Sequence, residues 1–217
     1  LRKGVALKRP GTWAMNRVYA RELLPPPRPS SSHKGMFGSI GIIGGSQGMV
    51  GAALLAGTAA LKLGAGRVYL GLIADNAPGV DGTQPELMLR PTQELFKLDT
   101  LNCMIIGPGL GIGIDACFWL SCALESDLPL VLDADALNLI ATRPRVANLL
   151  RTRKASSVLT PHPAEAARLL NTDTSTIQND RMAAAASLAE VFNCCAVLKG
   201  VGSISAAPGG KRYINAS

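Results

Sequence analysis

The 217-residue chain is 47% hydrophobic and 17% charged, and it carries a formal net charge of +7. This length and apolar content suit a single α/β domain that buries a sizeable core, and they exclude an intrinsically disordered chain. No apolar run approaches the roughly 18 residues that a transmembrane helix needs, and the first residues lack the apolar core of a secretory signal. We therefore expect a cytoplasmic protein without a membrane partner.

The basic residues are concentrated in two clusters. Aromatic residues, which single-strand nucleic-acid sites interleave with basic ones, make up only 4% of the chain. We therefore interpret the clusters as solvated surface and a basic tail, and we expect no nucleic-acid partner. The first cluster comprises Arg2, Lys3, Lys8, Arg9, Arg17, Arg21 and Arg28, and the second comprises Arg143, Arg145, Arg151, Arg153 and Lys154.

Five cysteines are present, an odd number without a C-x-x-C pair. This pattern favours reduced, buried thiols over a disulfide framework and indicates no zinc site. No metal ligands are assigned from the sequence.

The first 32 residues do not resemble the start of a domain. Residues 15–24 suit one helix, and the proline-rich segment 25–32 is typical of an extended linker. We therefore predict an N-terminal basic extension with a proline-rich linker at 1–32 and a nucleotide-binding domain at 33–217.

The domain begins with a strand, a glycine loop and a helix. An isoleucine-rich run at 39–43 predicts a buried strand, and the loop at 44–48 contains Gly44, Gly45 and Gly48. A helix is predicted at 51–62, with Gly64 as its C-cap. Free N–H groups and the helix dipole make such a loop a ready anion site. The spacing alone also suits a tight turn in any doubly wound protein.

The next strands also end in residues suited to ligand binding. A strand at 67–73 is followed by one at 103–106, which ends in a second glycine turn at 107–113. Asp115 could cap the helix that follows. A strand at 129–132 ends at Asp133, which suits Mg²⁺–phosphate chemistry, whereas Asp135 is interpreted mainly as a helix N-cap.

The last elements complete the predicted sheet. A strand at 157–160 leads to His162, held between two prolines, and Pro163 suits a helix N1 position. One long helix is predicted at 176–193. A strand at 196–199 then ends in the loop Lys199–Ser203, and strands at 204–206 and 211–214 form a hairpin. Loops that follow parallel strands share one edge, where α/β proteins bind ligands.

The exact residues of these segments are more informative than the strand, loop and helix pattern that they form. His33-Lys34-Gly35, Ile43-Gly44-Gly45-Ser46, Gly107-Pro108-Gly109-Leu110-Gly111, Asp133-Ala134-Asp135-Ala136-Leu137-Asn138, Pro161-His162-Pro163 and Lys199-Gly200-Val201-Gly202-Ser203 occur in one order. Together they resemble the ADP/ATP-dependent NAD(P)H-hydrate dehydratases over residues 24–217. Asp180-Arg181 resembles a further Asp-Arg pair of that family and is interpreted as structural. Ala164 replaces the family's usual glycine.

This resemblance implies a ribokinase-like three-layer αβα sandwich with a mostly parallel central sheet. It implies Mg²⁺, with ADP or ATP as co-substrate, and hydrated NADH or NADPH as substrate, whose hydroxyl would be phosphorylated and then eliminated. The hydrate would contact Ala52, Gly109, Gly111 and His162, and the nucleotide would contact Lys199, Gly200, Val201, Gly202 and Ser203.

The resemblance also implies a catalytic aspartate in a Gly-x-Gly-Asp segment, which does not occur between Lys199 and Ser217. We therefore expect the family's catalytic aspartate to lie beyond Ser217, with Asp133 as the fallback base. The chain is then either a fragment or a natural variant, with impaired turnover and one sheet face partly bare.

Two alternatives to the repair enzyme remain open. One is a vitamin-precursor or sugar-like kinase of the ribokinase-like group, and the other is a non-catalytic nucleotide-binding remnant. The helix after Gly51 is apolar nearly all round, so it is either buried on all sides or part of a homo-oligomer interface.

Overall fold

The computed structural model describes residues 27, 29, 31–32 and 34–215. Nine strands within these residues form one sheet in the order β3-β2-β1-β4-β5-β6-β7-β8-β9. Pairing is parallel from β3 to β7 and antiparallel at β8 and β9. The strands are β1 (Ser39–Gly44), β2 (Arg67–Leu72), β3 (Met88–Arg90), β4 (Cys103–Ile106), β5 (Leu130–Leu132), β6 (Ser157–Leu159), β7 (Cys195–Leu198), β8 (Ile204–Ala206) and β9 (Arg212–Ile214).

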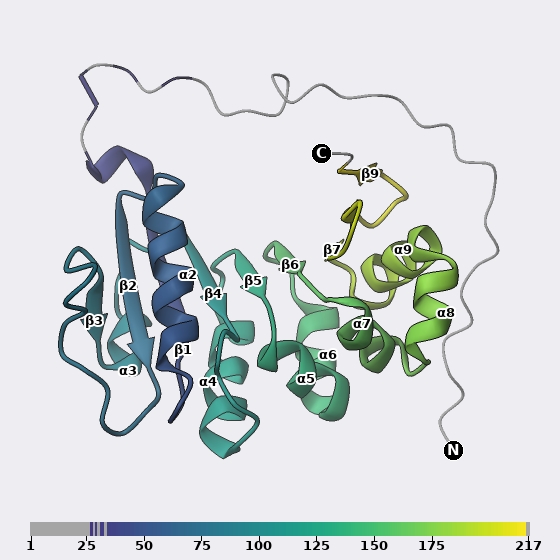
Figure 1. Ribbon diagram of the computed structural model, residues 1–217, viewed down its shortest axis with the longest axis horizontal. Coiled ribbons are helices and arrows are strands. Elements are labelled where there is room, and N and C mark those ends of the chain that lie inside the picture. The colour runs from purple at the N-terminus through teal and green to yellow at the C-terminus, as the bar shows by residue number, and fades with distance from the viewer. Residues whose placement is uncertain (1–26, 28, 30, 33, 216–217) are drawn as a thin grey trace.

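The helices lie between the strands in sequence and flank the sheet in space (Figure 1). The predicted α/β fold with a mostly parallel central sheet is confirmed. The helices are the 3₁₀ turn η1 (Lys34–Phe37), α2 (Val50–Lys62), α3 (Thr92–Leu95), α4 (Ile114–Glu125), α5 (Asp135–Thr142), α6 (Pro144–Thr152), α7 (Pro163–Leu170), α8 (Thr174–Asn179) and α9 (Arg181–Phe192). No helix in the described part of the chain is long and apolar enough to cross a membrane.

The two faces of the sheet are covered unequally. Met104, Ile106 and Leu132 are fully buried on the face that packs against α3 to α9. On the opposite face, α2 is the described helix that covers β1 and β2, with Leu87 packed beside it. There Ile105 and Val131, which pair in register, keep part of their side-chain surface exposed. The sheet face opposite α3 to α9 is therefore partly uncovered at β4 and β5 within the described residues. The expectation of a bare face rested on a missing helix after the strands that end at Lys199 and Ile214, and it stays a prediction.

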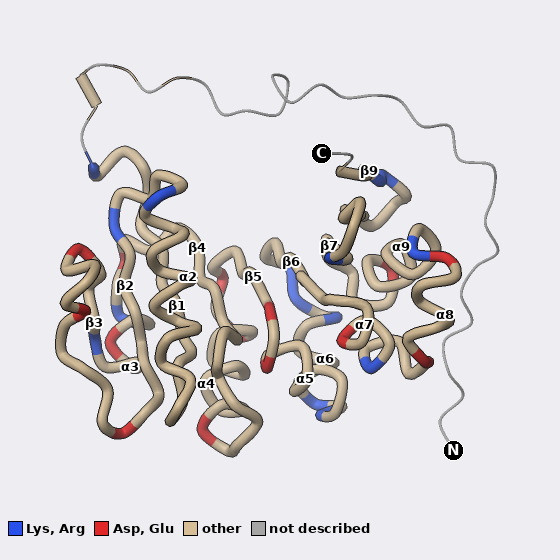
Figure 2. The backbone as a smooth tube through the Cα atoms, in the orientation of Figure 1, with Lys and Arg blue, Asp and Glu red and all other residues tan. Residues whose placement is uncertain are grey.

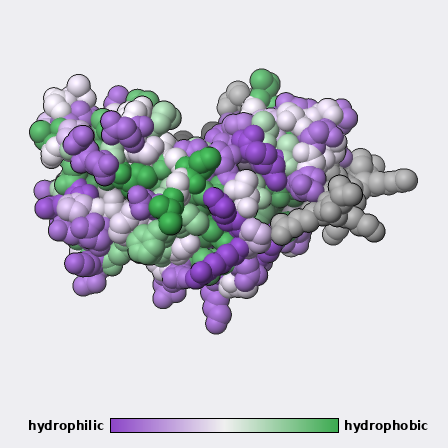
Figure 3. Space-filling model, turned by 90° about the horizontal axis from the view of Figure 1, so that it is seen from below, coloured by the Kyte–Doolittle hydropathy of each residue, from purple (hydrophilic) through white to green (hydrophobic). Residues whose placement is uncertain are grey.

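Figure 3 looks along the sheet toward the carboxyl ends of the parallel strands. Its upper outline is recessed between the part that contains α2 and the part that contains the C-terminal hairpin. The partly exposed row of β4, β5 and β6 lies between those two parts (Figure 1). The recess therefore corresponds to the uncovered stretch of sheet.

Several predicted helix boundaries are wrong. The helix expected at 176–193 is two helices, because the Asp180 carboxylate accepts a hydrogen bond from the Ala183 N–H (2.9 Å) and starts α9 anew. Asp115 lies in the first turn of α4 but makes no capping hydrogen bond, since Gly113 is the N-cap. Gly64 follows the C-cap residue Leu63, with φ of 107°. Helix α6, rich in arginine, was not predicted.

Part of the second basic cluster is structural and does not merely face solvent. Arg153 donates to the carbonyl oxygens of Leu124, Ser126 and Leu128, and burial lowers the pKa of its guanidinium. Arg151 lies over the ring of Phe192. Figure 2 shows the described basic residues spread along the molecule among acidic ones. The whole of the first cluster lies outside the described residues.

The five cysteines are free, as predicted, but they are not all buried. Only Cys194 is buried; burial, with a smaller contribution from Cys195, raises the pKa of its thiol to about 12. Cys195 is exposed, because neighbouring strand residues point to opposite faces of the sheet.

The unequal cover predicts different costs for the same substitution on the two faces. Ile106→Ala should lower the free energy of unfolding by about 2–5 kcal/mol, because it leaves a cavity in the closed layer. Ile105→Ala should cost about 1–2 kcal/mol, since part of that side chain already contacts water. Urea unfolding of both variants measures the difference, and equal losses would contradict the uneven layering.

Candidate functional site

Five loops meet at the carboxyl edge of the parallel strands. They follow β1, β4, β5, β6 and β7, which end at one edge because all five strands run in the same direction. The hydrogen-bond ladder extends one residue into the loops: Asp133 N–H donates to Ile106 O (3.2 Å), and Thr160 N–H donates to Leu132 O (3.1 Å). The first residue of each of these two loops is therefore held about as firmly as the strand itself.

The two glycine turns pack against each other and against the start of α2. Gly45 N–H donates to Pro108 O (3.0 Å), and Ser46 N–H donates to Gly109 O. A Cβ at Gly109 would lie 2.6 Å from the carbonyl oxygen of Met49 and 3.1 Å from the Ala52 Cβ, so a side chain would clash there. The structure thus brings Ala52 and Gly109 together, as expected.

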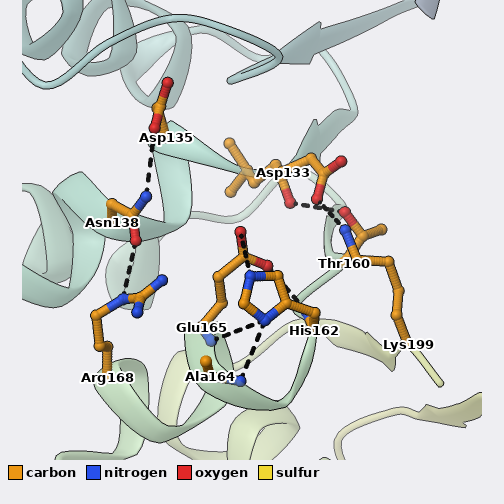
Figure 4. Close-up of polar contacts among 10 residues, drawn as sticks. Asp133, Asp135, Asn138, Thr160, His162, Ala164, Glu165, Arg168 and Lys199 are labelled. Carbon is orange, nitrogen blue, oxygen red and sulfur yellow. Dashed lines mark hydrogen bonds and ion pairs between the residues drawn. The ribbon is translucent and has the colours of Figure 1, made fainter. Parts of the chain in front are cut away.

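Asp135 ties the second glycine turn to two helices. Its carboxylate accepts from the Gly111 N–H (2.8 Å) and from Asn138 Nδ2 (3.3 Å), and Arg168 Nε donates to Asn138 Oδ1 (3.0 Å) (Figure 4). The prediction that Asp135 is mainly an N-cap is wrong, because α5 begins at Asp135 itself and its N-cap residue is Ala134. Asp135 instead fixes the position of Gly111.

Ala134, between the two aspartates, has a strained backbone. Its φ of 49° and ψ of −115° lie in a region that residues with a Cβ rarely adopt. The strained residue lets the two carboxylates face different partners: Asp133 meets Lys199, and Asp135 meets Gly111. Such strain tends to occur where a site requires a particular geometry.

Asp133 and Lys199 form an ion pair across the edge of the sheet. Lys199 Nζ lies 2.7 Å from Asp133 Oδ1, and the two side chains are 41% and 32% exposed for Lys199 and Asp133 respectively (Figure 4). The Lys199 N–H donates to Pro161 O (2.8 Å), which fixes the start of the loop. Both groups stay accessible to a ligand, so a phosphate could compete with Asp133 for the ammonium group.

His162 caps α7 and presents half of its ring to solvent. Its Nδ1 accepts from the N–H groups of Ala164 (3.1 Å) and Glu165 (3.4 Å), and the Glu165 carboxylate accepts the His162 N–H (2.8 Å). Because Nδ1 accepts, a neutral ring carries its proton on Nε2, which lies 3.5 Å from Glu165 Oε1. The side chain is 48% exposed. Pro163 occupies the first turn of α7, as predicted.

The described residues contain no group of three or more metal-ligating side chains. Asp133 therefore offers one carboxylate, and it is engaged by Lys199. Mg²⁺ commonly needs only one or two protein carboxylates when nucleotide phosphates supply its other ligands. Asp133 could thus supply one carboxylate to a metal that arrives with a nucleotide.

Two basic residues contact this edge without having been predicted as part of it, although Arg181 was interpreted as structural. Arg168 supports Asn138, and Arg181 donates to backbone carbonyls of the Lys199–Ser203 loop. Neither contact has a signal in the sequence, because each joins segments that only the fold brings together.

Several sequence predictions fall outside the described residues. They include the helix at 15–24, most of the extension and linker at 1–32, His33 from the first motif, and Ser217, the last residue of the sequence. The expectation that the family's catalytic aspartate lies beyond Ser217 therefore stays a prediction. The fallback base Asp133, by contrast, is described, and its carboxylate lies on the candidate edge beside Lys199.

Together, the order of the mostly parallel sheet and the helices that flank it define a ribokinase-like α/β protein, with Asp133, His162 and Lys199 at one edge of the sheet. The NAD(P)H-hydrate dehydratase family model matches residues 40–217. The chain therefore belongs to the NAD(P)H-hydrate dehydratase family.

Individual relatives agree with this assignment. The chain is 44% identical over 193 residues to the ADP-dependent (S)-NAD(P)H-hydrate dehydratase of Neisseria meningitidis, covering 88% of this chain and 65% of that protein. The crystal structure of the ADP/ATP-dependent dehydratase of Bacillus subtilis, obtained with ATP/Mg²⁺, matches with a TM-score of 0.74 and 29% identity, covering 88% of this chain and 68% of the other. A ribokinase-like superfamily protein of Enterococcus faecalis matches with a TM-score of 0.74 and 26% identity, covering 87% and 66%. The chain thus spans about two thirds of the length of these proteins.

The strain at Ala134 predicts a stabilising substitution. Ala134→Gly should raise the free energy of unfolding by about 1 kcal/mol, because glycine adopts a positive φ without a Cβ clash. Ala136→Gly is the matched control, and it should destabilise the protein because Ala136 is buried in α5. Urea unfolding compares the two, and a loss of stability in Ala134→Gly would contradict the strain.

Proposed function

We propose that this chain takes part in the nucleotide-dependent dehydration of hydrated NADH and NADPH, a repair of the nicotinamide cofactor. The observation that carries the proposal is the Lys199–Asp133 pair on the edge formed by both glycine turns and His162, in a member of this family. The hydroxyl oxygen of the hydrate would attack the terminal phosphorus of ADP or ATP, its proton would pass to a base, and AMP or ADP would leave. Loss of the resulting phosphate, with a proton from the neighbouring carbon, would restore the nicotinamide ring.

The nucleotide is proposed to lie on the Lys199–Ser203 loop. Lys199 supplies a compact positive charge near the phosphates, and the glycines of the loop let a ligand approach the backbone closely. Bound Mg²⁺ would neutralise phosphate charge and polarise the transferring group. Asp133 lies beside Lys199 and could face such an ion once the phosphates engage the ammonium group.

The hydrate is proposed to lie between the glycine turns and His162. Ala52 and Gly109 pack together near the start of α2, Gly111 lies beside Ser46, and His162 Nε2 can offer a hydrogen bond to a polar group of the hydrate. Asp133 is the base to test first, since it is the carboxylate that the described structure places beside Lys199.

The competing functions differ in their products. A dehydratase restores the absorbance of reduced nicotinamide when hydrated NADH and ADP are supplied with Mg²⁺. A vitamin-precursor or sugar-like kinase would instead release a stable phosphorylated product, and a non-catalytic remnant would bind the nucleotide without turnover. Turnover by residues 1–217 would place the base within them. Turnover only in a longer chain would place the base beyond Ser217.

The role of Lys199 can be separated from that of its partner. Lys199→Ala should weaken ADP binding about 10–100-fold, because a charge-assisted contact worth ~1.5–3 kcal/mol is lost. Asp133→Asn breaks the same ion pair but frees the ammonium group, so ADP titrated without Mg²⁺ should bind as tightly or more tightly. Isothermal titration calorimetry measures both variants. Unchanged affinity in Lys199→Ala, or an equal loss in both, would refute the contact between Lys199 and the nucleotide.

We also propose that the protein is a cytoplasmic homo-oligomer that uses the outer face of α2. Leu55 on that face is 74% exposed, so the alternative that α2 is buried on all sides of this chain is wrong. Light scattering should show more than one copy per particle, and Leu55→Glu should shift the mass toward the monomer, since a charge would have to be buried. A monomeric wild-type chain at micromolar concentration would exclude the interface. Free cysteines motivate the cytoplasmic location, which cell fractionation can test.

A further inference from the structure

Arg181 is the first residue of α9, and it reaches across to the loop that follows β7. Its Nη2 donates to the carbonyl oxygens of Leu198 (3.3 Å) and Lys199 (3.2 Å), and its Nη1 donates to that of Val201. The Asp180 cap fixes where α9 begins and therefore where this guanidinium starts. One side chain thus holds three carbonyl groups within four residues.

The direction of these carbonyls sets the direction of the next N–H groups. In a planar trans peptide the N–H points opposite to the C=O, and the described peptide bonds are all trans. The Leu198–Lys199 peptide illustrates this: its carbonyl faces Arg181, and its N–H donates to Pro161 on the other side (2.8 Å). The N–H groups of Gly200 and Gly202 must therefore also point away from Arg181.

Those two N–H groups are available to a ligand. Within the described residues, neither Gly200 N–H nor Gly202 N–H donates to a protein acceptor. Lys199 extends its ammonium group from the same segment, so two N–H donors and one charge are grouped in four residues. This is a set of donors suited to the acceptor atoms of a nucleotide.

Gly200 is required for the guanidinium to come this close. Its φ is 144°, and a Cβ there would lie 2.7 Å from Arg181 Nη2. A residue with a side chain would be strained at this φ and would press on the arginine. Gly200 and Arg181 therefore depend on each other.

We propose that Arg181 is a positioning residue for nucleotide binding. It grips the carbonyl side of residues 198–201 and so turns the N–H groups of Gly200 and Gly202 toward the nucleotide, without touching the nucleotide itself. This inference rests on the proposed function of the Lys199–Ser203 loop. Preorganised donors bind more tightly because their conformational entropy is lost when the protein folds and not when the ligand binds.

The test uses the full chain with Arg181→Lys, Arg181→Met and the control Arg145→Met. Lysine keeps the positive charge but lacks the planar fork that reaches several carbonyls at once. Arg145 is exposed on α6, so its loss removes one charge away from the loop. Calorimetry should show ADP binding about tenfold or more weaker in both Arg181 variants and unchanged in the control. Attraction by charge alone would leave Arg181→Lys at the wild-type affinity and would overturn the inference.

A second measurement does not depend on nucleotide binding. Amide hydrogen exchange at Lys199, whose N–H is bonded to Pro161, should speed up in Arg181→Lys while the melting temperature stays close to wild type. If Arg181→Met does not fold, the binding and exchange measurements on Arg181→Lys are sufficient to test the inference.

The outcomes separate this inference from the proposed function. If the wild type binds ADP and the folded Arg181 variants bind it equally well, the positioning role is refuted and the proposed function stands. If the wild type does not bind ADP, the proposed function of the loop fails and the inference fails with it. An unchanged rate of amide hydrogen exchange at Lys199 in Arg181→Lys would by itself refute the idea that Arg181 orders the loop.

Discussion

The candidate site depends on parallel pairing in register. Five adjacent strands end together, and their hydrogen bonding extends one residue further, so that Asp133, Thr160 and Lys199 begin their loops already bonded to the neighbouring segment. A register shift in any of these short strands would move a site residue by a full strand rise of about 3.3 Å. The register of the strands thus brings residues far apart in sequence within hydrogen-bonding distance.

Arginine side chains stabilise the loops and helix ends around the parallel sheet. Arg153 holds the carbonyls that precede β5, Arg168 supports Asn138, and Arg181 grips the loop after β7. Each guanidinium satisfies backbone or amide oxygens that would otherwise need water. The fork of N–H donors on one rigid plane makes arginine suited to this task, and it explains why part of the net positive charge has no role in attracting a ligand.

The layers around the sheet are unequal, and the site lies at the boundary between them. The face packed by α3 to α9 is closed, whereas α2 covers only β1 and β2 on the other face. The glycine turns and the start of α2 lie where the covered and partly open parts of the sheet meet. There the backbone is shaped by close contacts, such as Gly109 against Met49 and Ala52, and by the strained Ala134.

The sequence by itself determined the α/β class, most strands, and the membership of Gly109, Gly111, Asp133, His162 and Lys199 in one edge. These follow from local information: apolar runs mark strands, glycines mark turns, and parallel strands share an edge. Only the tertiary structure decided which of these groups touch. It showed that Asp135 holds Gly111, that Asp133 pairs with Lys199, and that Arg181 holds the Lys199–Ser203 loop. Partners such as Asp133 and Lys199 are 66 residues apart in the sequence. Their side chains meet only after the chain folds, so no local sequence pattern predicts the distance between them.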